Sequence, residues 1–125
     1  MKPSPPLSAE IARRLADAKA HSPTLVSPDG TALMLYGDIG GCAYIRPDGE
    51  ILYWGHDDDA PSPGSSGTAI ASIVIGSQRF PELQELLPPR PPTASDCPAC
   101  AGSGKFRQYD IICGSCNGLG WTSTA

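Results

Sequence analysis

Two pairs of cysteines near the end of the sequence are the residues best suited to chemistry. Cys97 and Cys100 form one C-x-x-C pair, and Cys113 and Cys116 form the other. Each pair opens a complete copy of the pattern C-x-x-C-x-G-x-G. A C-x-x-C turn directs two sulfurs at one metal ion, and zinc in structural sites takes four tetrahedral ligands. The spacing therefore predicts one structural zinc ion, Zn²⁺, bound by all four sulfurs.

The segment between the two pairs is long enough to bring them together. Residues 101–112 provide twelve positions, which suffice for a hairpin that returns the second pair to the first. The glycines of each repeat allow sharp turns with positive φ close to the metal. So short a segment buries little apolar surface, so metal ligation should supply most of its folding free energy. We expect the hairpin to unfold locally when one ligand is removed.

The cysteines could also have a catalytic role instead of a structural one. A C-x-x-C pair can act as a redox dithiol, so thiol–disulfide exchange is an alternative, although that chemistry needs one pair rather than two. Four cysteine ligands leave no coordination position for water, which argues against a catalytic zinc. No nucleophile with a base, phosphate-binding glycine loop or catalytic pair of carboxylates stands out. We therefore expect no enzyme, with no catalytic residues and no cofactor-binding residues beyond the metal ligands.

The other reactive residues are more simply explained by structural roles. Cys42 lies in an apolar segment and is expected in the core. Residues 56–59, His-Asp-Asp-Asp, should form a solvated acidic loop that could face a basic partner, rather than a site for a hard metal ion. Trp121 should pack across the zinc hairpin or onto the sheet. If it is exposed with Leu119 and Phe106, it would instead anchor a protein partner.

The first half of the chain is predicted to form a helix followed by a small antiparallel sheet. Ser8 is a candidate N-cap for a helix over residues 9–19, whose apolar face would contain Ile11, Leu15 and Ala18. Two Pro-Asp-Gly turns, at residues 28–30 and 47–49, then separate apolar segments. These segments predict a meander of four strands over residues 24–26, 32–36, 42–46 and 51–54.

The second half is more ambiguous. The β-branched residues of segment 69–75 favour a fifth strand, although its Ala-rich beginning could also open a helix. Residues 81–87 should form a short helix with proline at its first position. The fold class is α+β: an N-terminal helix on a small antiparallel meander, a short C-terminal helix, then the four-cysteine hairpin. The expected domains are a flexible arm 1–7, an α+β domain 8–87, a Pro-rich linker 88–96 and the zinc hairpin 97–125.

Composition restricts the classes of partner. Nine Lys and Arg against thirteen Asp and Glu give a net charge of −4 at pH 7, so phosphate backbones should be repelled. Nucleic-acid binding through the zinc hairpin is therefore only an alternative. The sequence shows neither the apolar run of about 20 residues that crosses a bilayer nor a secretory signal. Paired cysteines fit a reducing compartment, so we expect a cytoplasmic protein that makes no membrane contact.

The doubled cysteine motif resembles the cysteine-rich zinc region of DnaJ-type chaperones over residues 97–121. That resemblance implies zinc binding and, as an alternative function, thiol–disulfide exchange or holdase activity. The family pattern has four repeats and two zinc ions, whereas this chain has two repeats and therefore room for one. The His-Pro-Asp signature of a J domain is also absent from the sequence. The resemblance thus concerns the zinc region rather than the whole chain.

A second resemblance concerns residues 40–57, which read Gly-Gly-Cys-Ala-Tyr-Ile-Arg-Pro-Asp-Gly-Glu-Ile-Leu-Tyr-Trp-Gly-His-Asp. This segment is similar to the central hairpin of SUKH-type proteins, a superfamily that includes bacterial immunity proteins that neutralise toxins. The resemblance implies a protein partner, such as a toxin that is neutralised. The function predicted first is therefore a non-catalytic zinc-binding protein-interaction module, such as an immunity or adaptor protein.

Overall fold

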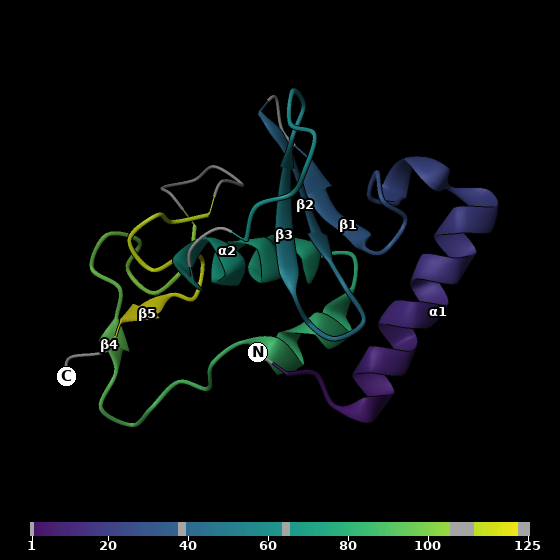
Figure 1. Ribbon diagram of the computed structural model, residues 1–125. Coiled ribbons are helices and arrows are strands. Elements are labelled where there is room, and N and C mark those ends of the chain that lie inside the picture. The colour runs from purple at the N-terminus through teal and green to yellow at the C-terminus, as the bar shows by residue number, and fades with distance from the viewer. Residues whose placement is uncertain (1, 38–39, 64–65, 106–111, 123–125) are drawn as a thin grey trace. The chain divides into compact units, whose positions relative to one another are not determined.

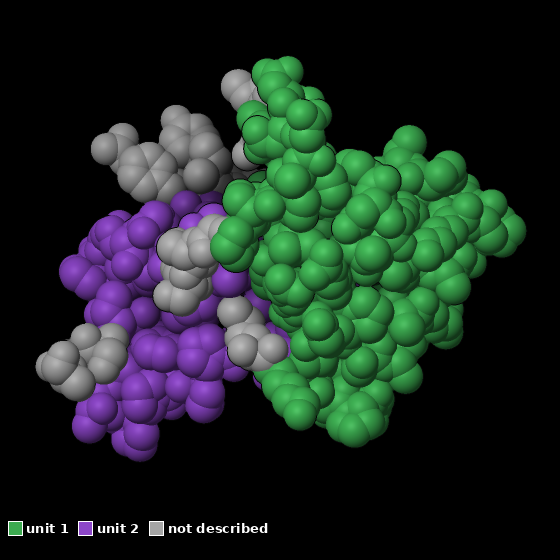
Figure 2. Space-filling model, viewed as in Figure 1, with its two compact units in different colours: residues 1–65 green, residues 66–125 purple. Residues whose placement is uncertain are grey.

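The computed structural model describes residues 2–37, 40–63, 66–105 and 112–122. The chain forms two compact units, residues 1–65 and residues 66–125, coloured separately in Figure 2. The boundary between the units lies within the segment 8–87 that the sequence suggested as one domain. The predicted domain limits themselves, including the arm and the Pro-rich linker, stay predictions. Each unit has its own buried interior and is described by itself.

Helix α1 spans Pro5–His21, so it begins earlier than the sequence indicated. Its N-cap is Ser4, whose side-chain oxygen accepts a hydrogen bond of 3.4 Å from the Leu7 amide. Two prolines occupy the first positions, where the missing N–H groups have no partner in a helix anyway. The predicted cap at Ser8 is wrong, because its hydroxyl instead donates to the Pro47 carbonyl oxygen at 2.7 Å.

The sheet of the first unit has three strands rather than four. Strands β1 (Leu33–Gly37), β2 (Gly41–Ile45) and β3 (Ile51–Gly55) pair antiparallel in the order β1-β2-β3. The predicted strand over residues 24–26 is wrong. Pro23–Leu25 forms a short 3-10 helix, η1, and only Val26 pairs with the sheet, in an isolated bridge to Leu33. A proline that begins a turn accounts for this difference, because it favours helical φ and cannot donate to a strand partner.

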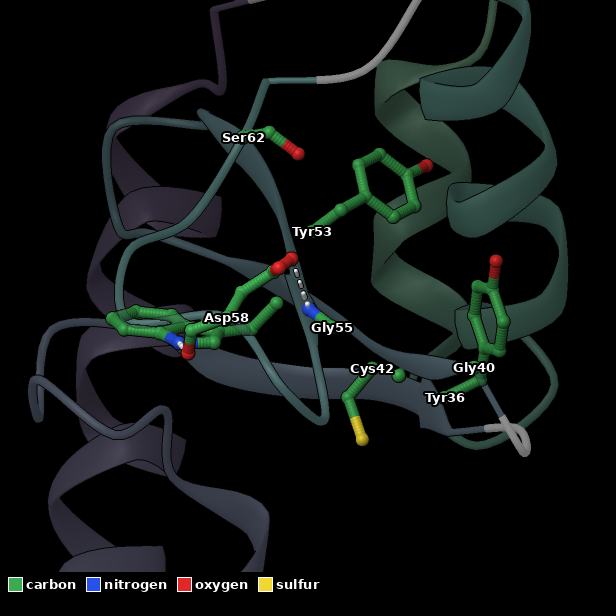
Figure 3. A pocket seen from close by; sticks show the side chains of 9 residues that line it. Tyr36, Gly40, Cys42, Tyr53, Gly55, Asp58 and Ser62 are labelled. Atoms are coloured by element: carbon green, nitrogen blue, oxygen red, sulfur yellow. Dashed lines mark hydrogen bonds between the residues drawn. The ribbon is translucent and has the colours of Figure 1, made fainter.

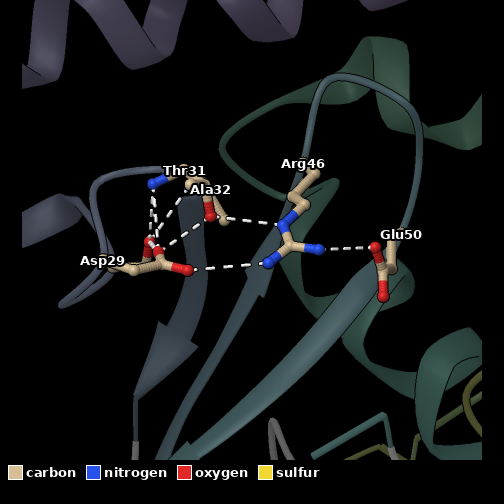
Figure 4. A network of polar contacts seen from close by, with 6 residues as sticks. Asp29, Thr31, Ala32, Arg46 and Glu50 are labelled. Carbon is tan, nitrogen blue, oxygen red and sulfur yellow. Dashed lines mark hydrogen bonds and ion pairs between the residues drawn. The ribbon is translucent and has the colours of Figure 1, made fainter. Parts of the chain in front are cut away.

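Both predicted Pro-Asp-Gly turns form, and a polar network connects them (Figure 4). Arg46 lies 3.5 Å from an Asp29 carboxylate oxygen and 2.7 Å from a Glu50 oxygen. The Ser27 hydroxyl is the main cause that lowers the pKa of Asp29 to about 2; burial opposes it, and Thr31 and Arg46 add to the lowering. The network thus joins the turn before β1 to the turn between β2 and β3.

The interior of the first unit is formed by α1 and the three-stranded sheet. Helix α1 contacts β1, and Figure 1 shows it running beside the sheet. Ile11 and Ile45 are completely buried. The remaining apolar core of this unit consists of Leu7, Leu15, Ala18, Ala32, Leu33, Leu35, Ala43, Tyr44, Ile51 and Leu52. The predicted apolar stripe of the helix is confirmed, with Leu7 extending it by one turn at the N-terminal end.

The second unit begins with helix α2, Ser66–Gly76, and this corrects the strand favoured for residues 69–75. Its buried positions are Ala69, Ser72, Ile73 and Gly76, which repeat with the period of a helix rather than of a strand. The Ser72 hydroxyl is satisfied by donating to the Thr68 carbonyl oxygen at 2.8 Å. Packing on one helical face has therefore overridden the strand propensity of β-branched residues.

The short helix expected next is present as the 3-10 helix η2, Pro81–Leu86, which contacts α2. Leu83 and Leu86 are its buried apolar side chains, and Phe80, which precedes it, is also buried. Two further strands, β4 (Ser95–Asp96) and β5 (Trp121–Thr122), pair antiparallel on either side of the cysteine region. These strands were not predicted, because two-residue strands show no alternation in a sequence.

The architecture confirms the α+β fold class: an N-terminal helix, a three-stranded antiparallel sheet, short helices and a C-terminal cysteine cluster. Within the described ranges, none of the helices combines the length and apolar character needed to span a membrane.

Candidate metal centre

The four predicted ligands come together in the second unit. The Sγ atoms of Cys97, Cys100, Cys113 and Cys116 all lie within 4.8 Å of one another, and the four residues are buried. The Cys97 and Cys113 sulfurs are 3.9 Å apart, and those of Cys100 and Cys116 are 3.8 Å apart. All are free thiols rather than disulfides. Sulfurs gathered at this spacing could hold a metal ion.

The two cysteine turns have the same backbone conformation. In the first turn, the amide of Gly102 donates to the Cys97 carbonyl oxygen at 3.2 Å, and Ala101 has a φ of 53°. In the second, the amide of Gly118 donates to the Cys113 carbonyl oxygen at 3.1 Å. Asn117, the counterpart of Ala101, has a φ of 56°. The sequence repeat is therefore a structural repeat.

Each turn also directs a backbone amide at its second sulfur. The Gly104 amide donates to the Cys100 sulfur at 3.3 Å, and the Gly120 amide donates to the Cys116 sulfur at 3.2 Å. Hydrogen bonds to a charged group favour its ionised form, so these amides stabilise thiolates. In known metal sites, amides at such positions are the outer partners that orient the binding sulfur.

The final glycine of each repeat lies against the backbone of the other repeat. A Cβ added to Gly104 would lie 2.6 Å from the Gly118 carbonyl oxygen, and one added to Gly120 would lie 2.7 Å from that of Gly102. Gly104 and Gly120 also have φ values of 76° and 86°. Both positions therefore require glycine for conformation and for close approach.

Reciprocal backbone hydrogen bonds complete the link between the repeats. The Cys113 amide donates to the Gly104 carbonyl oxygen at 2.8 Å, and the Cys97 amide donates to the Gly120 carbonyl oxygen at 3.0 Å. Lys105 and Ile112, which lie on either side of residues 106–111, form an antiparallel bridge. The backbone therefore brings the two cysteine pairs face to face.

The thiol pKa values reflect these surroundings. Burial raises the pKa of Cys100, but the Gly104 amide and neighbouring thiols outweigh it and lower the value to about 7. Amide donation from Cys116 and Ser115 lowers the pKa of Cys113, whereas burial raises the pKa of Cys116 to about 11. Several adjacent thiolates repel one another, so complete ionisation of the cluster requires a cation among the sulfurs.

The second cysteine turn also lies against helix α2, a relation that the sequence did not reveal. A Cβ on Gly118 would approach the Val74 side chain to 2.8 Å, so the turn and the helix are in close contact. Leu119 packs against the four cysteines. The apolar residue at position 119 was the only sign in the sequence that this turn packs against other residues. Val74 is distant along the chain, so the sequence gave no indication that it contacts the turn.

The remaining candidates have mixed outcomes. Cys42, expected in the core, is only half-buried and lines a pocket. The predicted exposure of residues 56–59 is confirmed. Trp121 is half-buried in β5, opposite Asp96, and Leu119 covers the sulfurs. Phe106, the third member of the suggested aromatic anchor, lies outside the described residues.

Comparison with known proteins yields no relative. No protein-family model matches the chain, and neither the curated proteins nor the solved structures include a significant match.

Proposed function

We propose that the four cysteines bind one structural zinc ion. The observation that carries the proposal is the spacing of the sulfurs. Zinc–sulfur bonds of about 2.3 Å at tetrahedral angles place neighbouring sulfurs about 3.8 Å apart. The separations of 3.9 Å for Cys97 and Cys113 and of 3.8 Å for Cys100 and Cys116 fit that geometry. An all-thiolate set also matches the preference of zinc over hard cations such as magnesium.

The ligand set supports a structural rather than a catalytic role. Four protein sulfurs fill a tetrahedral shell, so no position is left for a water molecule or a substrate. The sulfurs are buried, with Cys97 and Cys113 at 0% and 1% exposure. Backbone amides at Gly104 and Gly120 supply the outer hydrogen bonds. Zinc in this setting neutralises thiolate charge and holds the two turns together.

We infer further that the whole chain is a non-catalytic module that binds another protein. A zinc-braced unit and a second unit with its own apolar core, joined in one chain, suit a scaffold that presents surfaces. The net charge of −4 favours a partner with a basic surface over nucleic acid. The finer form of this proposal is an immunity or adaptor protein of the SUKH type, which rests on the resemblance of residues 40–57.

Metal analysis of protein purified without added metal or chelator tests the zinc site. Native mass spectrometry should find one zinc per chain in the wild type and a reduced zinc content in Cys113→Ser. Cys42→Ser is the matched control, because it removes a thiol outside the cluster, and it should retain one zinc. A wild-type protein without metal, with reactive thiols, would contradict the proposal. A disulfide in their place would favour thiol–disulfide exchange.

Affinity capture from the native cells tests the interaction role separately. The wild type and Lys19→Ala, which changes an exposed side chain of α1, should retain the same protein partner, whereas Cys113→Ser should lose it if the zinc hairpin contributes to binding. Retention of nucleic acid instead of protein, sensitive to salt through counterion release, would overturn the interaction role in favour of nucleic-acid binding.

A further inference from the structure

The first unit contains a surface pocket that the metal centre does not explain. Two adjoining hollows, of about 340 Å³ and 330 Å³, share Cys42, Trp54, Gly55 and Asp58 in their walls. Figure 3 shows the first hollow, where Tyr36 and Tyr53 lie on the opposite side from the Cys42 thiol. The second also includes Pro28, Tyr44, His56 and Asp59. Together the hollows surround the end of β3.

Strand register places an aromatic wall in the second hollow. Cys42 pairs with Trp54 across β2 and β3, and Tyr44 lies two residues further on the same face. Trp54 is half-buried, so part of its indole surface remains accessible. Its Nε1 donates to the Asp58 carbonyl oxygen at 3.1 Å, which holds the ring in place beside the loop. The pocket thus presents a fixed aromatic surface.

Carboxylates form the rim of the same hollow. One Asp58 oxygen accepts a hydrogen bond from the Gly55 amide at 3.1 Å, an arrangement visible in Figure 3. Asp59 is exposed, and within the described part of the chain it makes neither a hydrogen bond nor an ion pair. No lysine or arginine occurs among the described residues that line the two hollows. The Asp59 carboxylate is therefore available to a cation.

The charge distribution along the chain favours a cationic occupant at this place. Residues 1–65 contain nine Asp and Glu against five Lys and Arg, a net charge of −4. Residues 66–125 contain four of each and are neutral before any metal is counted. The entire formal net charge of the protein therefore belongs to the unit that contains the pocket. Complementary charge increases the association rate and selects the partner.

We propose that this pocket receives an arginine side chain from a basic segment of a protein partner. A guanidinium group stacks on an aromatic face and forms paired hydrogen bonds with a carboxylate, and the pocket places Trp54 and Asp59 together for both contacts. The occupant is a protein side chain because the hollow opens beside the exposed acidic loop 56–59, which can contact neighbouring basic residues. This inference rests on the proposed interaction role but is independent of zinc.

Titration with a defined peptide tests the inference. The probe is a capped heptapeptide of alternating glycine and arginine, and its control replaces each arginine with citrulline, which keeps the shape and removes the charge. The indole N–H signals of the two tryptophans report the result in the zinc-loaded full chain. The Trp54 signal should shift with the arginine peptide, whereas the Trp121 signal and the citrulline titration should show no change.

Two matched variants then locate the contact. Asp59→Asn should weaken peptide binding by about fivefold, the upper range for an exposed ion pair. Asp57→Asn removes the same charge from the same loop but from a residue outside the pocket lining, so it should weaken binding less than about twofold. Both positions are exposed, so both variants should fold normally.

Several outcomes would overturn the inference. Equal weakening by Asp59→Asn and Asp57→Asn would mean attraction to general charge rather than to the pocket. Equal binding of the citrulline peptide, or no Trp54 shift at millimolar peptide, would also refute it. These results would leave the zinc analysis and the capture of a partner unaffected, so failure of the pocket is distinguishable from failure of the proposed function.

Discussion

The first unit and the cysteine region of the second unit bury their interiors by different means. In the first unit, Ile11 and Ile45 are fully buried by apolar packing of a helix on a sheet. In the second, Cys97 and Cys113 are equally buried, but their neighbours are other sulfurs and backbone amides. Sulfur clusters of this kind contribute little apolar stabilisation unless a metal ion binds them.

The two kinds of burial predict two different sources of stability. Apolar burial spreads stability over many side chains, so each single loss is partial. Metal ligation concentrates stability in one ion and four bonds, so one loss removes most of it. The apolar core and the cysteine region should therefore respond to different treatments.

Metal removal should produce the largest effect. Structural zinc contributes about 10–16 kcal/mol of apparent binding free energy in zinc-finger peptides at neutral pH. We expect a strong chelator to abolish the dispersed amide signals of the cysteine turns and to leave those of β1, β2 and β3 in place. Two-dimensional NMR before and after chelation, with zinc restored as the control, measures this. Loss of the sheet signals together with the turn signals would break the contrast.

A cavity in the apolar core should have the opposite effect to metal removal: it should destabilise the first unit and leave zinc affinity unchanged. Ile11→Ala removes a side chain of zero exposure and should lower the free energy of unfolding of the first unit by about 2–5 kcal/mol. Zinc affinity should be unchanged, because the ligands belong to the other unit. Urea unfolding and chelator competition measure the two quantities. Lys19→Ala, on the exposed side of α1, should change stability by only about 0.5 kcal/mol.

Glycine substitutions compare close packing in the two units. Gly104→Ala combines a positive φ with a Cβ 2.6 Å from a carbonyl oxygen. It should lower the free energy of unfolding by more than the cost of φ strain alone, which is about 1–2 kcal/mol, and it should weaken zinc binding. Gly30→Ala, with a φ of 76° but open space, should show the φ strain alone. Gly114→Ala meets nothing within 4 Å and is the control inside the cysteine region. Equal zinc affinity for Gly104→Ala and Gly114→Ala would refute the close contact between repeats.

Acid should affect the units through different groups, with the smallest effect at Asp29. Hydrogen bonds, chiefly from Ser27, lower the pKa of Asp29 from 3.8 to about 2 in the folded state. Its stabilisation is therefore complete above pH 3.8 and is lost as the pH falls toward 2. Because the ion pair with Arg46 is partly exposed, the contribution should be about 1 kcal/mol or less.

Unfolding curves measured from pH 5 to pH 2 test the predicted loss of stabilisation at Asp29. Asp29→Asn should make the free energy of unfolding less dependent on pH in that window. Asp48→Asn in the second Pro-Asp-Gly turn, where the carboxylate accepts from the Glu50 amide at 2.9 Å, is the matched variant. In the proposed zinc site, protons compete with the metal for thiolates, so acid should release zinc. Zinc release only after the sheet unfolds would contradict the independence of the units.

The sequence predicted the parts whose cause is local. The Pro-Asp-Gly turns formed as expected because proline and glycine set backbone dihedrals within a few residues. The convergence of Cys97, Cys100, Cys113 and Cys116 followed from ligand type and spacing. The helix face of α1 followed from the periodicity of its apolar residues. The start of that helix was missed because two prolines suggested an arm, although proline is also well suited to a first helical turn.

What the sequence could not decide required contacts between distant residues. Segment 69–75 has the propensity of a strand, yet packing on the face of Ala69 and Ile73 makes it a helix. The contact of Gly118 with Val74 and the pairing of Asp96 with Trp121 join positions that no local pattern connects. Similarly, the strand register that places Cys42 beside Trp54 forms the pocket.

The four cysteines that could hold a metal ion, and the turns that position them, were thus predictable from the sequence alone, because sulfur chemistry and backbone dihedrals are properties of a few consecutive residues. Three features became clear only in the folded structure: the helix around Ile73, the residues that close the cysteine hairpin, and the meeting of an aromatic surface with the acidic loop. These outcomes depend on which surfaces bury one another, and that choice is made by the folded chain as a whole.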